Sequence, residues 1–353
     1  MPASVTKSAL AERTLQLVDI PSESGSEANV YSFVSECVHI PKVLDNGESL
    51  VFAKRTGGPV ILLAGHTDTV PAQGNLPGKI ENGSVHGLGA TDMKGGLAVM
   101  IELASWAAET DLAYDLALLF FPREELGPEV NPLPALFEQA PILDEAALVI
   151  CLEPTDNTLQ LGCLGNLDAR VVFEGRSAHS ARPWLGVNAI ALALEGLCPV
   201  LELEPRDVTI EGLLFREVLS VTRISGGIAS NVIPARAEAT LNFRYAPDRT
   251  PAEAKARVRE LVGRDVEIVN NSAAAHVASL SAPAVAALRD AGPFEVQPKQ
   301  AWTNVADFAA RGLDAVNLGP GATRYAHAVD EQIEIAALEQ TYTALQRFLL
   351  GSV

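Results

Sequence analysis

Histidine and acidic side chains end three strongly apolar stretches of this chain. His66 and Asp68 close "PVILLAGHTD", Glu124 and Glu125 close "LALLFFPREE", and Glu153 closes "LVICLE". Short apolar runs of this kind predict buried strands, and open α/β sheets bind ligands beyond the carboxyl ends of their strands. Adjacent acids resist burial unless a cation or a proton compensates their charge. Each pair alone is also consistent with solvated surface groups, but three of them predict a cation site at one edge of a sheet.

Two further residues extend this pattern. Asp92 lies in "GATDMKGG", where an acid near a helix start is unremarkable, and His327 lies in the Gly-rich loop "GPGATRYAHAVDE". Imidazole nitrogen and carboxylate oxygen are both zinc donors, and a catalytic zinc keeps one position for water. Two such ions can share a carboxylate, activate water and polarise a carbonyl, while an acid outside the metal ligands accepts the proton. Together these residues predict a hydrolytic site with two metal ions.

The elements that must position these residues form an α/β pattern in the first part of the chain. Strand-like runs are followed by helix-like ones, which is typical of a mixed sheet flanked by helices. The expected strands are 49–55, 59–66, 114–125 and 146–154, and the expected helices are 9–20, 22–38, 95–109 and 133–140.

The pattern changes at about residue 165. Alternating strands are expected at 166–175, 217–227, 236–246 and 266–271, with helices at 188–203 and 251–261. This βαββαβ order describes an α+β module of ferredoxin-like type. Helices at 282–291 and 304–312, a strand at 314–320 and a closing helix from Glu331 then restore the α/β pattern. We predict a catalytic domain of residues 1–164 and 275–353, with residues 165–274 inserted as a second domain.

Composition limits the class of partner. The chain has 353 residues, of which 48% are hydrophobic, and a formal net charge of −18. That charge argues against nucleic acid or an anionic membrane as a partner. The chain start has no apolar signal segment and no apolar run is long enough to span a bilayer, so we expect a cytoplasmic protein.

Seven motifs, in this order, resemble those of the M20 metallopeptidase/deacylase family over essentially the whole chain. They are "GHTDTVP", "GLGATDMKGG", "PREELG", "LEPT", "RSAHSARP", "ASNVIP" and "AHAVDE". The resemblance implies a zinc-peptidase-like catalytic domain and an inserted domain that acts as lid and dimerisation domain. It also implies two Zn²⁺ ions, with Co²⁺ or Mn²⁺ as possible substitutes.

The resemblance implies a role for each residue of the predicted metal site. His66 and Glu153 would hold one zinc ion, Glu125 and His327 the other, and Asp92 would bridge both. In the same way, Asp68 would clamp His66 and Glu124 would act as general base. The peptide bond between Asp92 and Met93 is expected to be cis, as it often is in such enzymes.

The same resemblance assigns roles to residues outside the metal site. His179 would reach the partner subunit's active site in a homodimer and stabilise the oxyanion. Asn231, Arg244 and Thr303 would contact the substrate, and an arginine suits a carboxylate through its planar fork.

Within the family, "GRSAHSARPWLGVNAI" and "AWTNVADFAARGLDAVNLGPG" are most similar to the actinobacterial type of succinyl-diaminopimelate desuccinylase. The implied reaction is hydrolysis of N-succinyl-L,L-2,6-diaminopimelate, a small N-acylated amino acid, in lysine and diaminopimelate synthesis. The chain departs from the subgroup at Cys163–Asn166, where "CLGN" replaces a basic stretch and removes a partner for the succinyl carboxylate. Arg176, Arg182 and Arg324 are the candidate replacements.

Two alternatives remain open. Acetylornithine deacetylase or another N-acyl-amino-acid deacylase, dipeptidase or carboxypeptidase would use the same site residues. A metal-free relative acting as a binding or scaffold protein would lack at least one ligand or the base, and this chain has all of them.

Overall fold

A computed structural model describes residues 7–351, which form two compact units. The first comprises the described residues up to Leu161, Ala278–Gln297 and the described residues from Thr303 onward, and the second comprises Gly162–Val277 and Pro298–Trp302. The last of these segments, assigned to the catalytic domain on sequence, belongs to the second unit. It does so because Trp302 Nε1 donates to the Ala273 carbonyl oxygen at 3.1 Å.

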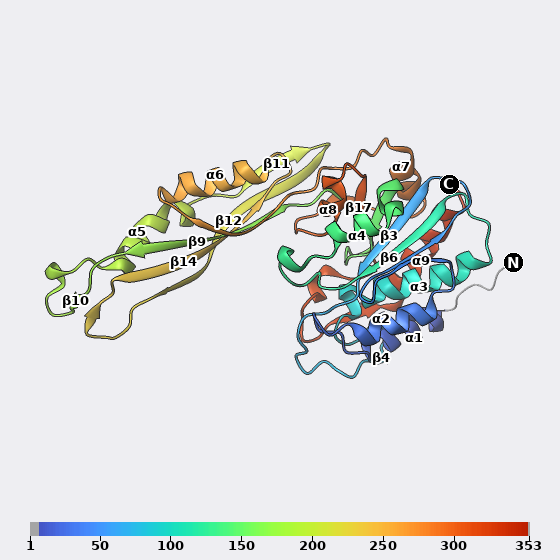
Figure 1. Ribbon diagram of the computed structural model, residues 1–353, viewed down its shortest axis with the longest axis horizontal. Helices are drawn as coiled ribbons and strands as arrows, with labels where there is room; N and C mark the ends of the chain where they lie inside the picture. The colour runs from blue at the N-terminus through green and yellow to red at the C-terminus, as the bar shows by residue number, and fades with distance from the viewer. Residues whose placement is uncertain (1–6, 352–353) are drawn as a thin grey trace. The chain divides into compact units, whose positions relative to one another are not determined.

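An eight-stranded mixed sheet forms the centre of the first unit (Figure 1). In sheet order the strands are β1 (Lys42–Asp45), β2 (Leu50–Lys54), β6 (Asp115–Phe121), β3 (Val60–His66), β7 (Ala146–Cys151), β17 (Ala315–Asn317), β8 (Leu159–Leu161) and β16 (Val296–Pro298). β3 runs parallel to both β6 and β7, and every residue of β3 and β6 is buried. Uninterrupted burial is expected for parallel strands covered on both faces. The carboxyl ends of these three strands therefore meet at one edge.

Helices cover this sheet. They are α1 (Lys7–Val18), α2 (Ala28–Cys37), α3 (Gly95–Ala108), α4 (Leu133–Gln139), α7 (Pro283–Asp290), α8 (Val305–Ala310) and α9 (Ile335–Leu349). α1, α3 and α9 contact one another, whereas α8 packs on β7 and β17. α9 buries Leu338, Tyr342, Leu345 and Leu349, the three- and four-residue spacing of an amphipathic helix.

The closing helix begins later than the sequence predicts, at Ile335 instead of Glu331. Residues Gln332–Glu334 form β18, which pairs with β5 (Ser84–His86) in a three-stranded sheet completed by β4 (Lys79–Glu81). Pairing with β5 satisfies the backbone hydrogen bonds of this segment as a strand. This pairing depends on a distant part of the chain, so local helix propensity does not predict it.

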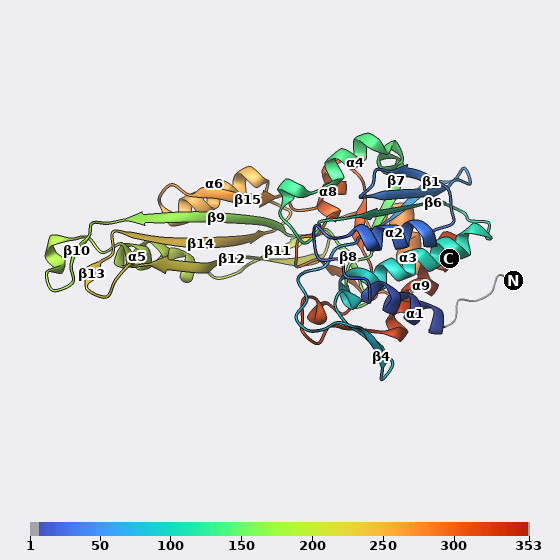
Figure 2. The ribbon, with the colours of Figure 1, turned by 60° about the horizontal axis from the view of Figure 1, so that its bottom comes forward.

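The second unit contains an antiparallel sheet with both helices on one face (Figure 2). In sheet order its strands are β11 (Arg206–Ile210), β12 (Leu213–Gly226), β14 (Arg236–Tyr245), β9 (Gly165–Glu174) and β15 (Glu267–Ser272). α5 (Ala189–Leu201) and α6 (Pro251–Val262) pack on the buried side chains of β9 and β14, which alternate with less buried ones. The predicted α/β class with an inserted ferredoxin-like α+β module is confirmed.

Three strands of the second unit are absent from the sequence-based prediction. β11 forms a hairpin with β12, and β10 (Ala178–His179) pairs with β13 (Val232–Ile233). The two-residue strands are too short to show a hydrophobic period, and in β11 only Val208 and Ile210 are apolar. Among the helices of residues 7–351, none combines the length and apolar character that crossing a bilayer requires.

Candidate active site

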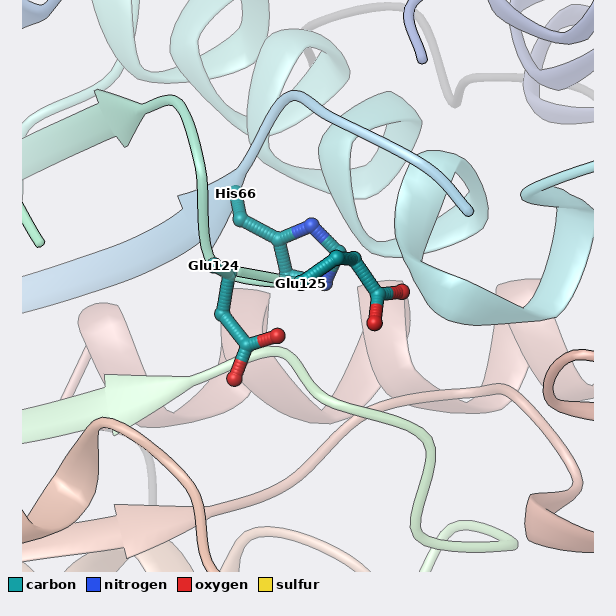
Figure 3. Close-up of side chains that lie close together, drawn as sticks. All are labelled: His66, Glu124 and Glu125. Carbon is teal, nitrogen blue, oxygen red and sulfur yellow. The ribbon is translucent and has the colours of Figure 1, made fainter. Parts of the chain in front are cut away.

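The carboxyl ends of β3, β6 and β7 carry the predicted histidine and acids. His66 is the last residue of β3, Glu124 and Glu125 lie in the turn after β6, and Glu153 follows β7. Figure 3 shows His66 beside the two glutamates, whose carboxylate groups point in different directions. His66 is buried, and its Nδ1 atom lies 3.1 Å from the Asp68 carbonyl oxygen and 3.4 Å from Asp68 Oδ1. The other ring nitrogen, Nε2, is thereby directed towards the remaining acids.

Asp92 lies in an irregular turn directly before α3. Ala90–Lys94 form a π-helical turn in which Asp92 and Met93 have non-helical backbone angles. The peptide bond between them is cis, as expected from the sequence. This backbone places Asp92 Oδ1 at 3.2 Å from His66 Nε2 and Asp92 Oδ2 at 3.4 Å from His327 Nε2. One carboxylate therefore faces both histidines, one oxygen to each.

His327 comes from the opposite end of the chain. Its backbone has a φ of 61°, an unusual value for a residue with a side chain. Gln73 Nε2 donates to the His327 carbonyl oxygen at 3.1 Å. The Nε2 atom of His327 lies 3.0 Å from Glu125 Oε1. The loop conformation thus turns the imidazole towards the strand ends.

The potential ligand atoms form two triads that share Asp92. His66, Asp92 and Glu153 form the first, Asp92, Glu125 and His327 form the second, and the ligand atoms within each triad lie within 4.8 Å of one another. One imidazole and two carboxylates make a donor set that suits zinc and related divalent cations. The residues present therefore fit a centre for two divalent ions.

The electrostatics of the cluster favour positive charge. Asp92 and Glu125 raise the pKa of His327 to about 10, outweighing the opposite effect of burial. Burial lowers the pKa of His66, but the carboxylates of Asp68 and Asp92 outweigh it and raise that pKa well above its usual value. The negative field that holds protons on these imidazoles would equally attract metal cations.

Asp68 organises the β6 turn as well as His66. Its two carboxylate oxygens accept the backbone N–H groups of Glu124 and Glu125 at 3.0 and 3.1 Å, and Ser24 Oγ donates to it at 2.7 Å. Burial opposes ionisation, but hydrogen bonds from His66, Ser24 and the Glu124 N–H hold the pKa of Asp68 at about 2. The ionised Asp68 carboxylate therefore fixes the backbone positions from which the side chains of Glu124 and Glu125 extend.

Glu124 differs from its neighbour Glu125 because its carboxylate belongs to neither triad that contains Asp92. It does lie within reach of His66 and Glu125 as a third group. Burial, followed by the charge of Glu153, raises the pKa of Glu124 well above its usual value. The site therefore holds one carboxyl group with high proton affinity beside the two triads of potential ligands.

The second unit carries three of the predicted residues in two separate places. His179 and Asn231 are exposed at the β10–β13 pair, where the Ser180 N–H donates to the Asn231 carbonyl oxygen. Arg244 lies near the end of β14, eight residues beyond Arg236, which corresponds to roughly 26 Å along an extended strand. His179 and Arg244 therefore occupy opposite ends of this unit.

Arg244 lines a cavity of about 370 Å³ within the second unit, with Leu164, Leu214, Arg216, Val218 and Gln300. Arg244 Nε donates to Asn242 Oδ1 at 3.0 Å, and no carboxylate of the described residues lies within ion-pair distance of its guanidinium. Burial lowers the pKa of this arginine. A half-buried cation with no carboxylate in direct contact is a ready site for a carboxylate.

Thr303 lies in the first unit and is buried. Its Oγ1 atom donates to Asn317 Oδ1 at 2.9 Å, at the carboxyl end of β17. Its hydroxyl group is thus fixed to the sheet, next to the strand ends that carry the potential metal ligands.

Two residues of the site were not predicted from sequence. Ser24 donates to Asp68, and Glu331 accepts hydrogen bonds from the backbone around Asp92. Ser24 gave no signal, because serine in a polar loop is common. Glu331 did give one, since it is the acid that closes "AHAVDE", four residues after His327.

Comparison with known proteins places the chain among peptidases. The sequence pattern of peptidase family M20/M25/M40 matches residues 62–351. A Mycobacterium tuberculosis protein, named provisionally as a succinyl-diaminopimelate desuccinylase, is 40% identical over 96% of this chain and 98% of its own length. The succinyl-diaminopimelate desuccinylase of Corynebacterium glutamicum is 36% identical over 95% of each chain. The fold is also that of a Staphylococcus aureus tripeptidase, with a TM-score of 0.81, 18% identity, and coverage of 99% of this chain and 100% of that one.

Proposed function

Because the chain belongs to peptidase family M20/M25/M40 and is a metal-dependent amidohydrolase, we propose that it hydrolyses N-succinyl-L,L-2,6-diaminopimelate. The products are succinate and L,L-diaminopimelate. The observation that carries the hydrolytic chemistry is the pair of triads sharing Asp92, with Glu124 beside them. The choice of substrate is supported by the two desuccinylase-named relatives at 36–40% identity.

The triads assign the metal ligands of this proposal. His66 and Glu153 would hold one ion, Glu125 and His327 would hold the other, and Asp92 would be shared by both. We propose Zn²⁺ for both positions, with Co²⁺ or Mn²⁺ as substitutes. When bound, two such ions make a water molecule more acidic and polarise the substrate carbonyl.

Glu124 is the general base in this proposal. Its carboxylate starts from the same turn as the ligand Glu125 but lies outside both triads, so it is available for proton transfer. Glu124 takes the proton from the attacking water and then delivers it to the nitrogen of the leaving amine. Asp68 keeps this turn in place through the backbone N–H groups of both glutamates.

The second unit supplies most of the substrate contacts in this proposal. Arg244 binds a carboxylate of the substrate, and the cavity that it lines is bounded by Leu164 of the "CLGN" stretch. Arg216, on the wall of the same cavity, is a further candidate for the succinyl carboxylate. It is exposed and bound to Asp207 by two hydrogen bonds, a kind of surface pair that contributes little to stability and can be exchanged. Thr303, from the first unit, adds a further contact, and Asn231, which lies beside His179, would act with it on the substrate of the partner subunit.

The assay that tests this function compares substrates differing in one group. The zinc-loaded protein is given N-succinyl-diaminopimelate, N-acetyl-diaminopimelate, N-acetylornithine and a simple dipeptide, and kcat/KM is measured for each. Charged hydrogen bonds to the succinyl carboxylate lead us to expect a preference of about 10–100-fold over the acetyl analogue. Metal-loaded protein that releases no succinate would refute the desuccinylase assignment, and faster hydrolysis of N-acetylornithine or the dipeptide would establish the corresponding alternative.

We further propose a homodimer in which the second unit forms the interface. Beyond the hairpin with β11, β12 has no neighbour on one side among the described strands, so Val218–Gly226 is a free edge. Free edges favour pairing with another chain. The nearby surface also exposes large apolar side chains, namely those of Ile190, Leu194, Leu201, Ile224 and Ile228.

His179 is suited to act as a hydrogen-bond donor for the oxyanion in such a dimer. The Ala181 N–H donates to His179 Nδ1 at 3.1 Å, so the proton of the neutral imidazole lies on Nε2. His179 lies at the opposite end of its unit from the Cys163–Ala275 bridge, where the chain enters and leaves. This position is consistent with action on the partner subunit.

His179→Ala is expected to lower kcat by about 10²–10³-fold, the cost of one oxyanion donor, with zinc content unchanged. A mixed dimer gives the sharper readout. One protomer carries His179→Ala and the other Glu124→Gln, so a trans-acting His179 restores one complete site of the two. Mixed dimers as inactive as both parents would show that His179 does not serve the partner, and full activity of the single variant would remove its oxyanion role.

A further inference from the structure

Glu331 holds the backbone of the turn that carries Asp92. The Gly89 N–H donates to Glu331 Oε2 at 2.8 Å, and the N–H groups of Thr91 and Asp92 donate to Oε1 at 3.0 Å each. Glu331 is only 2% exposed, so water does not compete for these bonds. Three backbone donors in and next to this irregular turn thus converge on one carboxylate.

This contact is fixed from both sides. The Gly87 N–H donates to the Glu331 carbonyl oxygen at 2.9 Å, and Thr91 Oγ1 donates to the Gln332 carbonyl oxygen at 2.6 Å. Pairing of β18 with β5 holds the segment that follows Glu331. These backbone contacts hold the Glu331 carboxylate in place against the turn.

The same loop reaches Asp92 twice. His327 Nε2 lies 3.4 Å from the side-chain Oδ2 atom of Asp92. Glu331, four residues later in the chain, accepts a hydrogen bond from the backbone N–H of Asp92. Glu331 itself belongs to none of the potential ligand groups among the described residues. Its carboxylate is engaged with backbone donors, so its effect on the site must pass through Asp92.

We propose that Glu331 is a positioning residue that orients the shared carboxylate of Asp92 between the two metal positions. The proposal rests on the metal centre proposed above but not on the substrate. Both carboxylate oxygens are needed, because three N–H groups require acceptors on two sides. The amide of a glutamine offers one acceptor oxygen and would direct its NH₂ group against one set of donors. Because Asp92 is common to both triads, loss of Glu331 should weaken both metal positions together.

The test measures zinc binding to Glu331→Gln, Glu331→Ala and a matched control, Glu334→Gln. Glu334 is an exposed acid at the end of the same strand, β18, so its change alters local charge without touching the turn. Zinc is titrated into each metal-free protein in chelator-buffered solution. Substitution of residues that hold metal ligands in place commonly weakens metal binding by about 10–100-fold, and we expect that loss at both sites in Glu331→Ala. Glu331→Gln should fall between it and the wild type, whereas the control should match the wild type.

Thermal unfolding with and without zinc distinguishes a purely structural role of Glu331 from the proposed positioning role. A purely structural role lowers the Tm of both forms equally and keeps the rise in Tm on adding zinc, while a positioning role reduces that rise. The proposal is overturned if folded Glu331 variants bind two zinc ions with wild-type affinity, or if only one site weakens. Should Glu331→Ala fail to fold, the same criteria apply to Glu331→Gln. A wild-type protein that binds no zinc would refute the metal centre itself, a separate outcome from failure of Glu331 alone.

Discussion

Glu124→Gln is expected to reduce kcat by about 10²–10⁴-fold, the usual contribution of a general base. The substitution keeps the shape of the side chain and removes its ability to accept a proton. Both metal ions should stay bound, because Glu124 belongs to neither triad that contains Asp92. The measurement is kcat with N-succinyl-diaminopimelate, paired with zinc content by elemental analysis.

Glu125→Ala is the matched comparison for this variant. The two residues are adjacent in one turn and Asp68 holds both backbone N–H groups, yet only Glu125 lies with Asp92 and His327 in a triad. Glu125→Ala should therefore lose zinc as well as activity. Equal zinc loss in both variants would show that base and ligand have not been distinguished correctly.

The sequence was informative about the site because burial and charge conflict there. His66, Glu125 and Glu153 each lie at the end of, or a few residues after, a strand that is apolar almost throughout. The sequence therefore indicates ionisable side chains next to a buried core. Parallel pairing of β3 with β6 and β7 then brings these ends to one edge. The α/β class and the order of the inserted module could be predicted for a different reason, because their strands and helices show clear hydrophobic patterns.

Local patterns could not supply the contacts between distant segments. His327 and Glu125 are 202 residues apart in the chain, and their 3.0 Å contact depends on the loop before β18. The residues alone offered His327 only as a histidine in a Gly-rich loop that extends the pattern, and its pairing with Glu125 was implied by the resemblance to a known family. The irregular turn at Ala90–Lys94 also could not be predicted from local patterns, because its backbone donors are satisfied by Glu331 from the far end of the chain.

The division of labour in the site follows from how each acid is supported. Asp68 and Glu331 are both buried and both accept backbone N–H groups, so each fixes a turn: Asp68 the one after β6, and Glu331 the one before α3. The acids proposed as ligands are carried by these turns or follow strand ends. Two structural carboxylates thus hold the turns that carry Glu125 and Asp92, two of the acids proposed as ligands.

Asp92→Ala is expected to have the largest effect on the chain's metal content, removing high-affinity zinc at both positions. Asp92 is the one residue common to the two triads, with its Oδ1 atom facing His66 and its Oδ2 atom facing His327. Activity should fall by at least about 10³-fold, because bound metals contribute several kcal/mol to the reaction and each 1.4 kcal/mol is tenfold in rate. The measurement is zinc stoichiometry after dialysis, with far-UV circular dichroism to establish that the variant is folded.

Glu153→Ala is the control for the shared role of Asp92. Glu153 lies in the triad with His66 but not in the triad with His327, so its loss should weaken one metal position and spare the other. The two variants remove the same chemical group from the same cluster and differ only in how many triads contain it. A folded Asp92→Ala protein that still holds one zinc ion at wild-type affinity would show that the two positions do not depend on a common ligand, and the bridging role would have to be abandoned.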